Sequence, residues 1–158
     1  MTQLVWRIAT DTSDYASTDL SGLGAEIVGG RWNRKGTPLI YTSTSIALAC
    51  LETLVHLAGG MPRPFNRYLV RFTLPEDAWK SRIVFDPATN VGWDALPAGL
   101  VSLDWGTHWA KSGASLLAQV PSIVVPEEGN VLINPAHPDV ASINAKKMRR
   151  WTYDGRLV

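Results

Sequence analysis

The sequence has one cysteine, almost no net charge and no long apolar run. A single cysteine, Cys50, excludes an intramolecular disulfide and is typical of a reducing compartment. Fifteen basic and fourteen acidic residues give a net charge of +1, so no overall field would attract nucleic acid or an anionic membrane. No stretch approaches the roughly 18 apolar residues of a membrane span, and residues 1–15 lack the apolar run of a signal peptide. We therefore expect a cytoplasmic protein that contacts neither a membrane nor nucleic acid directly.

Hydrophobic residues, in contrast, are plentiful. They make up 46% of the 158 residues, against 18% charged residues, and seven of them are Trp. This composition is far from that of disordered chains. A chain of this size buries roughly two-thirds of the surface that its unfolded form exposes. We predict one globular domain over residues 1–158, without an internal repeat or a linker.

Short apolar or alternating runs, bounded by Gly, Pro and polar residues, predict the strands. They cover residues 4–8, 39–41, 67–72, 82–85, 122–125, 131–133 and 149–153. Capping residues at 42–45, apolar residues at helical spacing and the Gly59-Gly60 pair predict a helix over 46–58. A second helix is predicted over 105–112, where Trp105 and Trp109 stand four residues apart as core residues. The fold class is α+β: a single compact domain with several short strands and few helices.

Glu52 is the only formally charged residue from Gly36 to Pro62, and it stands in the apolar helix. Removing a carboxylate from water costs several kcal/mol unless a partner or a polar cleft compensates. Two interpretations follow. Glu52 forms a structural ion pair or lies at a surface edge, or it faces a groove where it stabilises positive charge that develops in a reaction.

Arg31 follows the Gly29-Gly30 pair, whose missing side chains let a ligand approach the main chain. Its guanidinium could hold a pyrophosphate through two hydrogen bonds, or it could simply stack on Trp32 at the surface. Tyr41, at the end of a predicted strand, could stack on an aromatic ligand or belong to the core.

Three other motifs do not predict a functional site. Residues 22–27 begin like a dinucleotide fingerprint, but Ile27 replaces the third glycine and we predict no helix after it, which argues against a Rossmann fold. Cys50 and His56 point to different faces of their helix and cannot form a dyad, and Cys50 is expected in the core. Glu52 and His56 find no second half of a metal site, so no metal is expected.

One basic cluster, residues 146–150, is interpreted as a solvated face, with nucleic acid or an acidic partner as the alternatives.

The order of the motifs resembles that of the RES domain, from residue 6 to residue 157. The matching segments are 20–25 (Leu-Ser-Gly-Leu-Gly-Ala), 29–33 (Gly-Gly-Arg-Trp-Asn), 36–38 (Gly-Thr-Pro), 41–43 (Tyr-Thr-Ser), 47–56 (Ala-Leu-Ala-Cys-Leu-Glu-Thr-Leu-Val-His), 121–126 (Pro-Ser-Ile-Val-Val-Pro), 130–138 (Asn-Val-Leu-Ile-Asn-Pro-Ala-His-Pro) and 153–157 (Tyr-Asp-Gly-Arg-Leu). The resemblance implies a fold similar to that of ADP-ribosyltransferase toxins. It also implies a toxin that splits NAD at the nicotinamide bond, and a neutralising Xre-type antitoxin as its partner.

Carried over residue by residue, the resemblance makes Arg31, Tyr41 and Glu52 the catalytic residues. It implies Arg7, Ser122 and Asn134 as further substrate-binding residues. NAD is then a substrate, and no cofactor is expected.

The expected chemistry suits a carboxylate. Nicotinamide leaves as a neutral ring, so positive charge concentrates on the ribose as an oxocarbenium ion, which Glu52 would stabilise. Transferases that modify proteins often carry Glu or Gln two residues before the catalytic Glu, where this sequence has Cys50. This departure favours water or phosphate as the acceptor. An ADP-ribosyltransferase with a protein target and a nucleotide-binding module without catalysis remain the alternatives.

Overall fold

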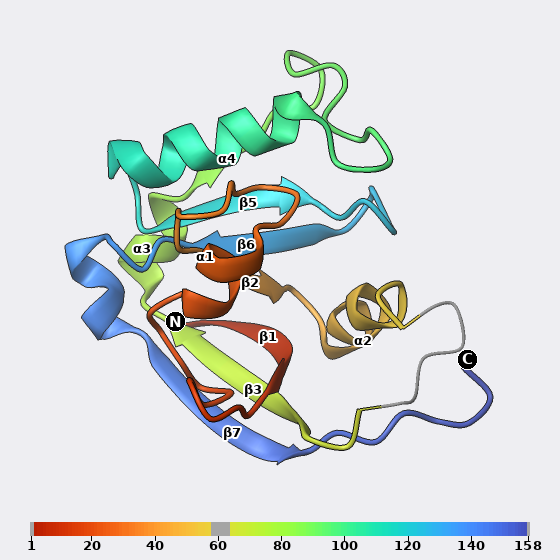
Figure 1. Cartoon of the computed structure of the whole chain (residues 1–158). Coiled ribbons are helices and arrows are strands. Elements are labelled where there is room, and N and C mark those ends of the chain that lie inside the picture. The colour runs from red at the N-terminus through yellow and green to blue at the C-terminus, as the bar shows by residue number, and fades with distance from the viewer. Residues whose placement is uncertain (1, 58–63, 158) are drawn as a thin grey trace.

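A computed structural model describes residues 2–57 and 64–157, which form a seven-stranded mixed sheet with helices packed on it (Figure 1). The elements in chain order are β1 (Gln3–Thr10), α1 (Leu23–Val28), β2 (Ile40–Ser43), α2 (Ile46–Leu54), β3 (Arg67–Leu74), α3 (Glu76–Lys80), β4 (Ile83–Val84), α4 (Leu100–Ser112), β5 (Leu117–Pro121), β6 (Gly129–Ile133), a 3-10 helix (Pro138–Ser142) and β7 (Asn144–Arg150). The predicted α+β class, as one domain with short strands and few helices, is confirmed. In the described part of the chain no helix is long and apolar enough to cross a membrane.

The sheet is divided between β1 and β2. The strand order is β4-β5-β6-β2-β1-β3-β7, and neighbours are antiparallel except for β4 and β5. β1 pairs with β3 along its whole length, from Gln3 opposite Leu74 to Thr10 opposite Arg67. It pairs with β2 at a single position, Trp6 opposite Ser43. Beyond Trp6 the edge of β1 that faces β2 is therefore open, and the sheet parts into two halves (Figure 1).

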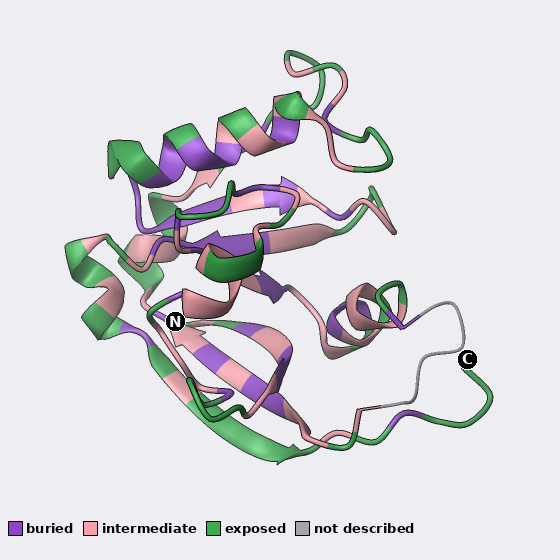
Figure 2. Ribbon diagram, in the orientation of Figure 1, coloured by how far each residue is buried: buried purple, intermediate pink, exposed green. Residues whose placement is uncertain are grey.

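The sheet carries two large hydrophobic cores. The first joins Val5, Val70 and Phe72 of β1 and β3 to Leu117 of β5 and Val131 of β6, so it runs across both halves of the sheet. On the β5–β6 half, α4 covers the sheet with its buried face (Figure 2), and the core beneath it is aromatic. Its rings are Trp32, Phe85, Trp93, Trp105 and Trp109. The two tryptophans predicted for the core, Trp105 and Trp109, lie there as expected.

Gly106 is what allows α4 to approach so closely. A Cβ at this position would lie 1.9 Å from the carbonyl oxygen of Trp32, a distance that no real contact reaches. The main chain of Trp32 therefore packs directly against the helix. This contact fixes the segment that carries Arg31.

Two predicted strands are wrong in position. Residues 122–125 form a turn, because the Ser122 hydroxyl accepts hydrogen bonds from the amides of Val124 and Val125 and bends the chain after β5. The last strand is β7 and ends at Arg150, whereas residues 149–153 were expected. Its side chains are exposed on a sheet edge, so it lacks the apolar alternation that marks a half-buried strand.

The helices also depart from expectation at their ends. A short helix, α1, begins at Leu23, where none was predicted. Gly22 permits it with a φ of 70°, and a Cβ there would lie 2.6 Å from the amide nitrogen of Leu39. The Rossmann fold stays excluded, because one strand pair alone is parallel among the described strands. Helix α4 begins five residues earlier than predicted, and α2 ends at Leu54, while Ala58, Gly59 and Gly60 lie outside the described residues.

Candidate active site

Glu52 is half-buried on α2 and is held by one of its two oxygens. The helix is placed by Ser45, whose hydroxyl caps it by accepting from the amide of Leu48, and by the buried side chain of Leu48 itself. Oε1 of Glu52 accepts hydrogen bonds from Ser122 Oγ at 2.6 Å and from Asn130 Nδ2 at 2.8 Å. Among the described residues no hydrogen bond reaches Oε2, and no cation lies within 4.0 Å of the carboxylate. The carboxylate is thus fixed by neutral donors and keeps one oxygen for a ligand.

Ser122 is fully buried, and its role is to orient Glu52. Its hydroxyl donates to the carboxylate and accepts from the two turn amides described above. All its hydrogen-bonding capacity is used inside the protein. The structure therefore brings Ser122 to the site, as predicted, but as a positioning residue behind Glu52.

Asn130 is a site residue that the sequence did not predict. It stands on β6 opposite Ser43 of β2, whose hydroxyl donates to Asn130 Oδ1 at 2.8 Å. The amide thus links β2 to Glu52. The available signal was a polar side chain placed immediately before the buried run of residues 131–133. Such a side chain at the start of a central strand needs a partner.

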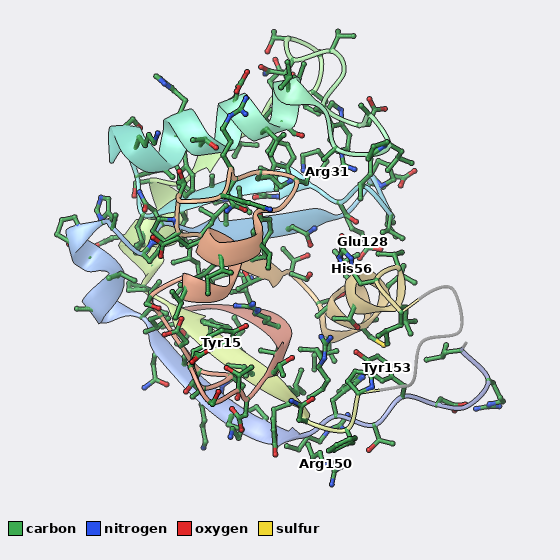
Figure 3. The ribbon with its side chains drawn as sticks, viewed as in Figure 1. Tyr15, Arg31, His56, Glu128, Arg150 and Tyr153 are labelled. Atoms are coloured by element: carbon green, nitrogen blue, oxygen red, sulfur yellow. The ribbon has the colours of Figure 1, made fainter. Side chains whose placement is uncertain are left out.

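Arg31 is half-buried beside Glu52. Its Nη1 donates to the carbonyl oxygens of Trp93 at 3.0 Å and Ala95 at 2.9 Å, so the loop after β4 holds the guanidinium (Figure 3). Burial lowers the pKa of Arg31, and the nearby negative charge of Glu52 opposes that shift. The other guanidinium nitrogens have no hydrogen bond within the described residues, which leaves them free to bind an anion or a ribose oxygen.

Tyr41 braces the loop that carries Arg31. Its hydroxyl donates to Asn33 Oδ1 at 2.6 Å and accepts from the amide of Trp32 at 3.0 Å. A Cβ on Gly30 would lie 2.6 Å from this hydroxyl, so only glycine fits there. Burial raises the pKa of Tyr41 far above its ordinary value, and the hydroxyl stays protonated. Tyr41 therefore stabilises the conformation of the Gly-Gly-Arg-Trp-Asn motif.

Arg7 stands on β1 next to Trp6, which pairs with Ser43 of β2, the strand that carries Tyr41. Burial lowers the pKa of Arg7, while Tyr15 and Asp19 oppose that shift. Arg7 thus lies where β1 parts from β2.

Asn134 is not brought to this site. It is 1% exposed, donates to the carbonyl of Ala110 in α4 and accepts from the amide of Ala136. It follows the C-terminal end of β6, whereas Asn130 lies at the other end of that strand. Its amide ties β6 to α4.

The remaining polar candidates do not gather into a metal site. Within the described ranges, no three side chains of His, Cys, Asp or Glu lie close enough to hold an ion. His56 is exposed at the end of α2, and Cys50 packs against the cluster of Ile8, Ala49 and Leu69, on the other face of that helix from Glu52. The basic residues 146–150 are exposed along β7.

Comparison with known proteins gives the family of the chain. The RES domain family model matches residues 4–155. A Sphingobium protein named "Prs ADP-ribosylating toxin" is 53% identical over 160 residues, which cover all of this chain and 98% of the relative. Two proteins named "Toxin Res" are each 37% identical: one from Yersinia enterocolitica over 149 residues, with 90% of this chain and 93% of the relative covered, and one from Pseudomonas putida over 155 residues, with 98% and 99% covered. The chain therefore belongs to the RES domain family.

Proposed function

We propose that the protein is a toxin that uses NAD as its substrate and breaks the bond between nicotinamide and ribose. The observation that carries the proposal is the carboxylate of Glu52, fixed through Oε1 by Ser122 and Asn130 and open at Oε2. Arg31 stands beside it with unused donors. The names of the relatives support the toxin assignment.

The reaction needs a group that stabilises positive charge. The C–N bond between ribose C1′ and the nicotinamide nitrogen breaks, and its electron pair leaves with the neutral nicotinamide. Positive charge then develops on the ribose, where Oε2 of Glu52 stabilises it. An acceptor oxygen forms the new bond to C1′ and releases its proton to Glu52 or to solvent.

Arg31 supplies positioning. Its Nη1 is fixed by two carbonyls, so its remaining donors have a defined direction toward substrate oxygens. Tyr41 has an indirect role, because its hydroxyl is hydrogen-bonded to the loop that carries Arg31. The resemblance implies a catalytic role for Tyr41, but its hydroxyl has the contacts of a positioning residue.

The acceptor is best sought among proteins. The sequence favoured water or phosphate because Cys50 stands two residues before Glu52. On a helix, however, residues two apart are separated by about 200°, and Cys50 packs into the core. Its identity therefore says nothing about the acceptor. The 53% identical relative is named for ADP-ribosylating Prs, which favours transfer of ADP-ribose to a protein, with Prs as the first candidate.

One experiment tests both steps. Purified protein is incubated with NAD, with and without Prs and with and without phosphate, and nicotinamide, free ADP-ribose, its phosphorylated form and ADP-ribosyl-protein are quantified by mass spectrometry. We expect nicotinamide release and labelled Prs. Free ADP-ribose or its phosphorylated form alone would make hydrolysis or phosphorolysis the activity. Tight NAD binding without nicotinamide release would instead make the chain a nucleotide-binding module.

The partner that we propose is an Xre-type antitoxin, which the family resemblance implies, and we propose further that it covers Arg31. A carboxylate of the antitoxin could take the donors of Arg31 that otherwise bind the substrate. Expression of the toxin alone is then expected to lower cellular NAD and to arrest growth, and co-expression of the antitoxin to restore both. NAD binding that is unchanged in the saturated complex would refute this occlusion.

A further inference from the structure

A second polar pocket lies where the sheet is open. It has a cavity of about 70 Å³ between α1 and the free edge of β1. A single water needs roughly 10–15 Å³ of such a cavity, so the cavity can hold a larger group. Its walls include Arg7, Tyr15, Ser17, Gly22, Gly24 and Arg67, and we refer to it as the Arg7–Arg67 pocket. Figure 3 places Tyr15 and Arg31 on opposite sides of α1 in this view.

The donors in this pocket lack protein acceptors. Within the described residues, the guanidinium groups of Arg7 and Arg67 make no hydrogen bond and no ion pair. Arg67 Nε is buried without a partner. The hydroxyl of Ser17, a residue that is 2% exposed, makes no hydrogen bond of ordinary geometry, although the Asp11 carboxylate, which accepts from the Ser17 amide, lies near it. Native structures rarely leave buried donors unpaired, because each unmet donor costs about 1–3 kcal/mol. The pocket therefore has the form of a site that a ligand completes.

The charges specify the ligand. Two guanidinium groups face one cavity, and the positive charge of Arg67 opposes that of Arg7. The carboxylate of Asp19 also lines the cavity and acts on the pKa of Arg7 more strongly than Arg67 does. Two guanidinium groups and one carboxylate leave the pocket positive, and an anionic group with several oxygens would satisfy both arginines and the hydroxyl together. Phosphate groups have this geometry, and the planar fork of arginine suits them.

The Arg7–Arg67 pocket adjoins the strand that carries Tyr41. Leu39, two residues before Tyr41, lines the pocket, and Trp6, next to Arg7, pairs with Ser43 of β2. Arg31 was expected to grip the pyrophosphate, yet it stands beside the carboxylate that stabilises the ribose. Resting on the proposed function, we infer that the diphosphate of NAD binds in the Arg7–Arg67 pocket, with Arg67 and Ser17 as its previously unassigned ligands beside Arg7. Arg31 then contacts the ribose end of the substrate.

The test separates binding from turnover. ADP-ribose and adenosine are titrated by calorimetry into the full-length Glu52→Gln protein and into its double variants with Arg67→Gln and Ser17→Ala. Arg71→Gln is the matched control, because Arg71 stands on the same strand, has an equally buried and unpaired Nε, and does not line the pocket. Thermal melts accompany every variant.

We expect Arg67→Gln to weaken ADP-ribose binding at least tenfold, Ser17→Ala to weaken it less, and Arg71→Gln to leave it unchanged. Adenosine, which lacks the diphosphate, should be insensitive to all three changes. The ADP-ribose affinity of the Arg67→Gln variant should also depend less on ionic strength, because one anion contact has gone.

Equal ADP-ribose affinities for the Arg67→Gln and Arg71→Gln variants would overturn the inference, even if the wild type cleaves NAD. If instead the wild type releases no nicotinamide but ADP-ribose affinity still depends on Arg67, the proposed function fails and the diphosphate site stands. Should Arg67→Gln fail to fold, Arg67→Lys replaces it: the ammonium keeps the charge and loses the two-pronged geometry, so ADP-ribose binding should weaken while its dependence on ionic strength is retained.

Discussion

The Glu52–Arg31 site and the Arg7–Arg67 pocket hold their charged groups in different ways. In the first, Glu52 is fixed by Ser122 and Asn130, and Arg31 by two main-chain carbonyls. In the second, the guanidinium groups of Arg7 and Arg67 have no hydrogen bond within the described residues. The first pair of charged groups is oriented by protein contacts before any ligand binds, and the second is not.

The difference separates catalysis from binding. A group that stabilises a transition state must be oriented in advance, since reorganisation at the moment of reaction would raise the barrier. A group that binds the ground state can instead keep its donors unpaired and gain its partners from the ligand. The unpaired donors lower the stability of the empty protein, which is the usual cost of a binding site.

The largest effect is expected from Glu52→Gln. Glutamine keeps an oxygen that accepts from Ser122 and Asn130 but removes the charge, so nicotinamide release should fall about 100- to 1,000-fold while the melting temperature stays nearly unchanged. Steady-state kinetics and a thermal melt measure both quantities. A marked drop in melting temperature, with normal activity in the folded fraction, would show that Glu52 is structural and that the comparison fails.

Ser122→Ala comes next and tests whether the orientation of Glu52 matters. A hydrogen bond to a charged group contributes about 1.5–3 kcal/mol, so the turnover number should fall roughly 10- to 100-fold. The Michaelis constant for NAD should change little, because Ser122 is buried behind the carboxylate. Ser81→Ala, on an exposed serine with a similar local hydrogen bond, is the control. A change confined to the Michaelis constant would make Ser122 a substrate ligand.

Most of the fold could be predicted from the sequence, because its elements follow local patterns. The helix around Glu52 has a cap and apolar spacing, and β1, β3 and β6 are apolar runs, so these four were located correctly. The failures arose where a side chain or an edge position overrides the local pattern. Ser122 bends an apolar segment into a turn, and β7 is an exposed edge strand that shows no alternation.

The same distinction between local patterns and tertiary context applies to the site residues. The sequence predicted Arg31, Tyr41 and Glu52 because each differs in polarity or charge from its neighbours. It could not distinguish Asn130 from Asn134, since both flank the same apolar run and only the pairing of β6 with β2 and β5 decides which end faces Glu52. In the sequence Arg67 is an ordinary strand residue. Its place in the pocket depends on the opening of the sheet beside Arg7, which the sequence does not predict.

Tyr41→Phe should lower the turnover number less than Ser122→Ala does, and it should act mainly on stability and substrate binding. The change removes the hydroxyl that joins Asn33 to the amide of Trp32, so the free energy of unfolding should fall by about 1–3 kcal/mol. Because the loop with Arg31 loosens, the Michaelis constant for NAD should rise more than the turnover number falls. Urea denaturation and steady-state kinetics test this. Unchanged stability with lost activity would mean that the hydroxyl contacts the substrate directly.

The smallest effect is expected at Cys50, on the other face of the helix that carries Glu52. Burial raises the pKa of this thiol, so at pH 8 less thiolate is present than for a free cysteine and alkylation should be slower than in the unfolded chain. The rate of Cys50 alkylation should still rise as the pH increases toward the raised pKa, and unfolding in urea should remove the protection of the thiol from alkylation. Cys50→Ala should therefore change both nicotinamide release and ADP-ribose transfer by less than about twofold, a free-energy effect of under about 0.5 kcal/mol. Were Cys50 part of an acceptor site, transfer to protein would fall while nicotinamide release continued, so measuring the two products side by side decides whether this face of α2 takes any part in the reaction.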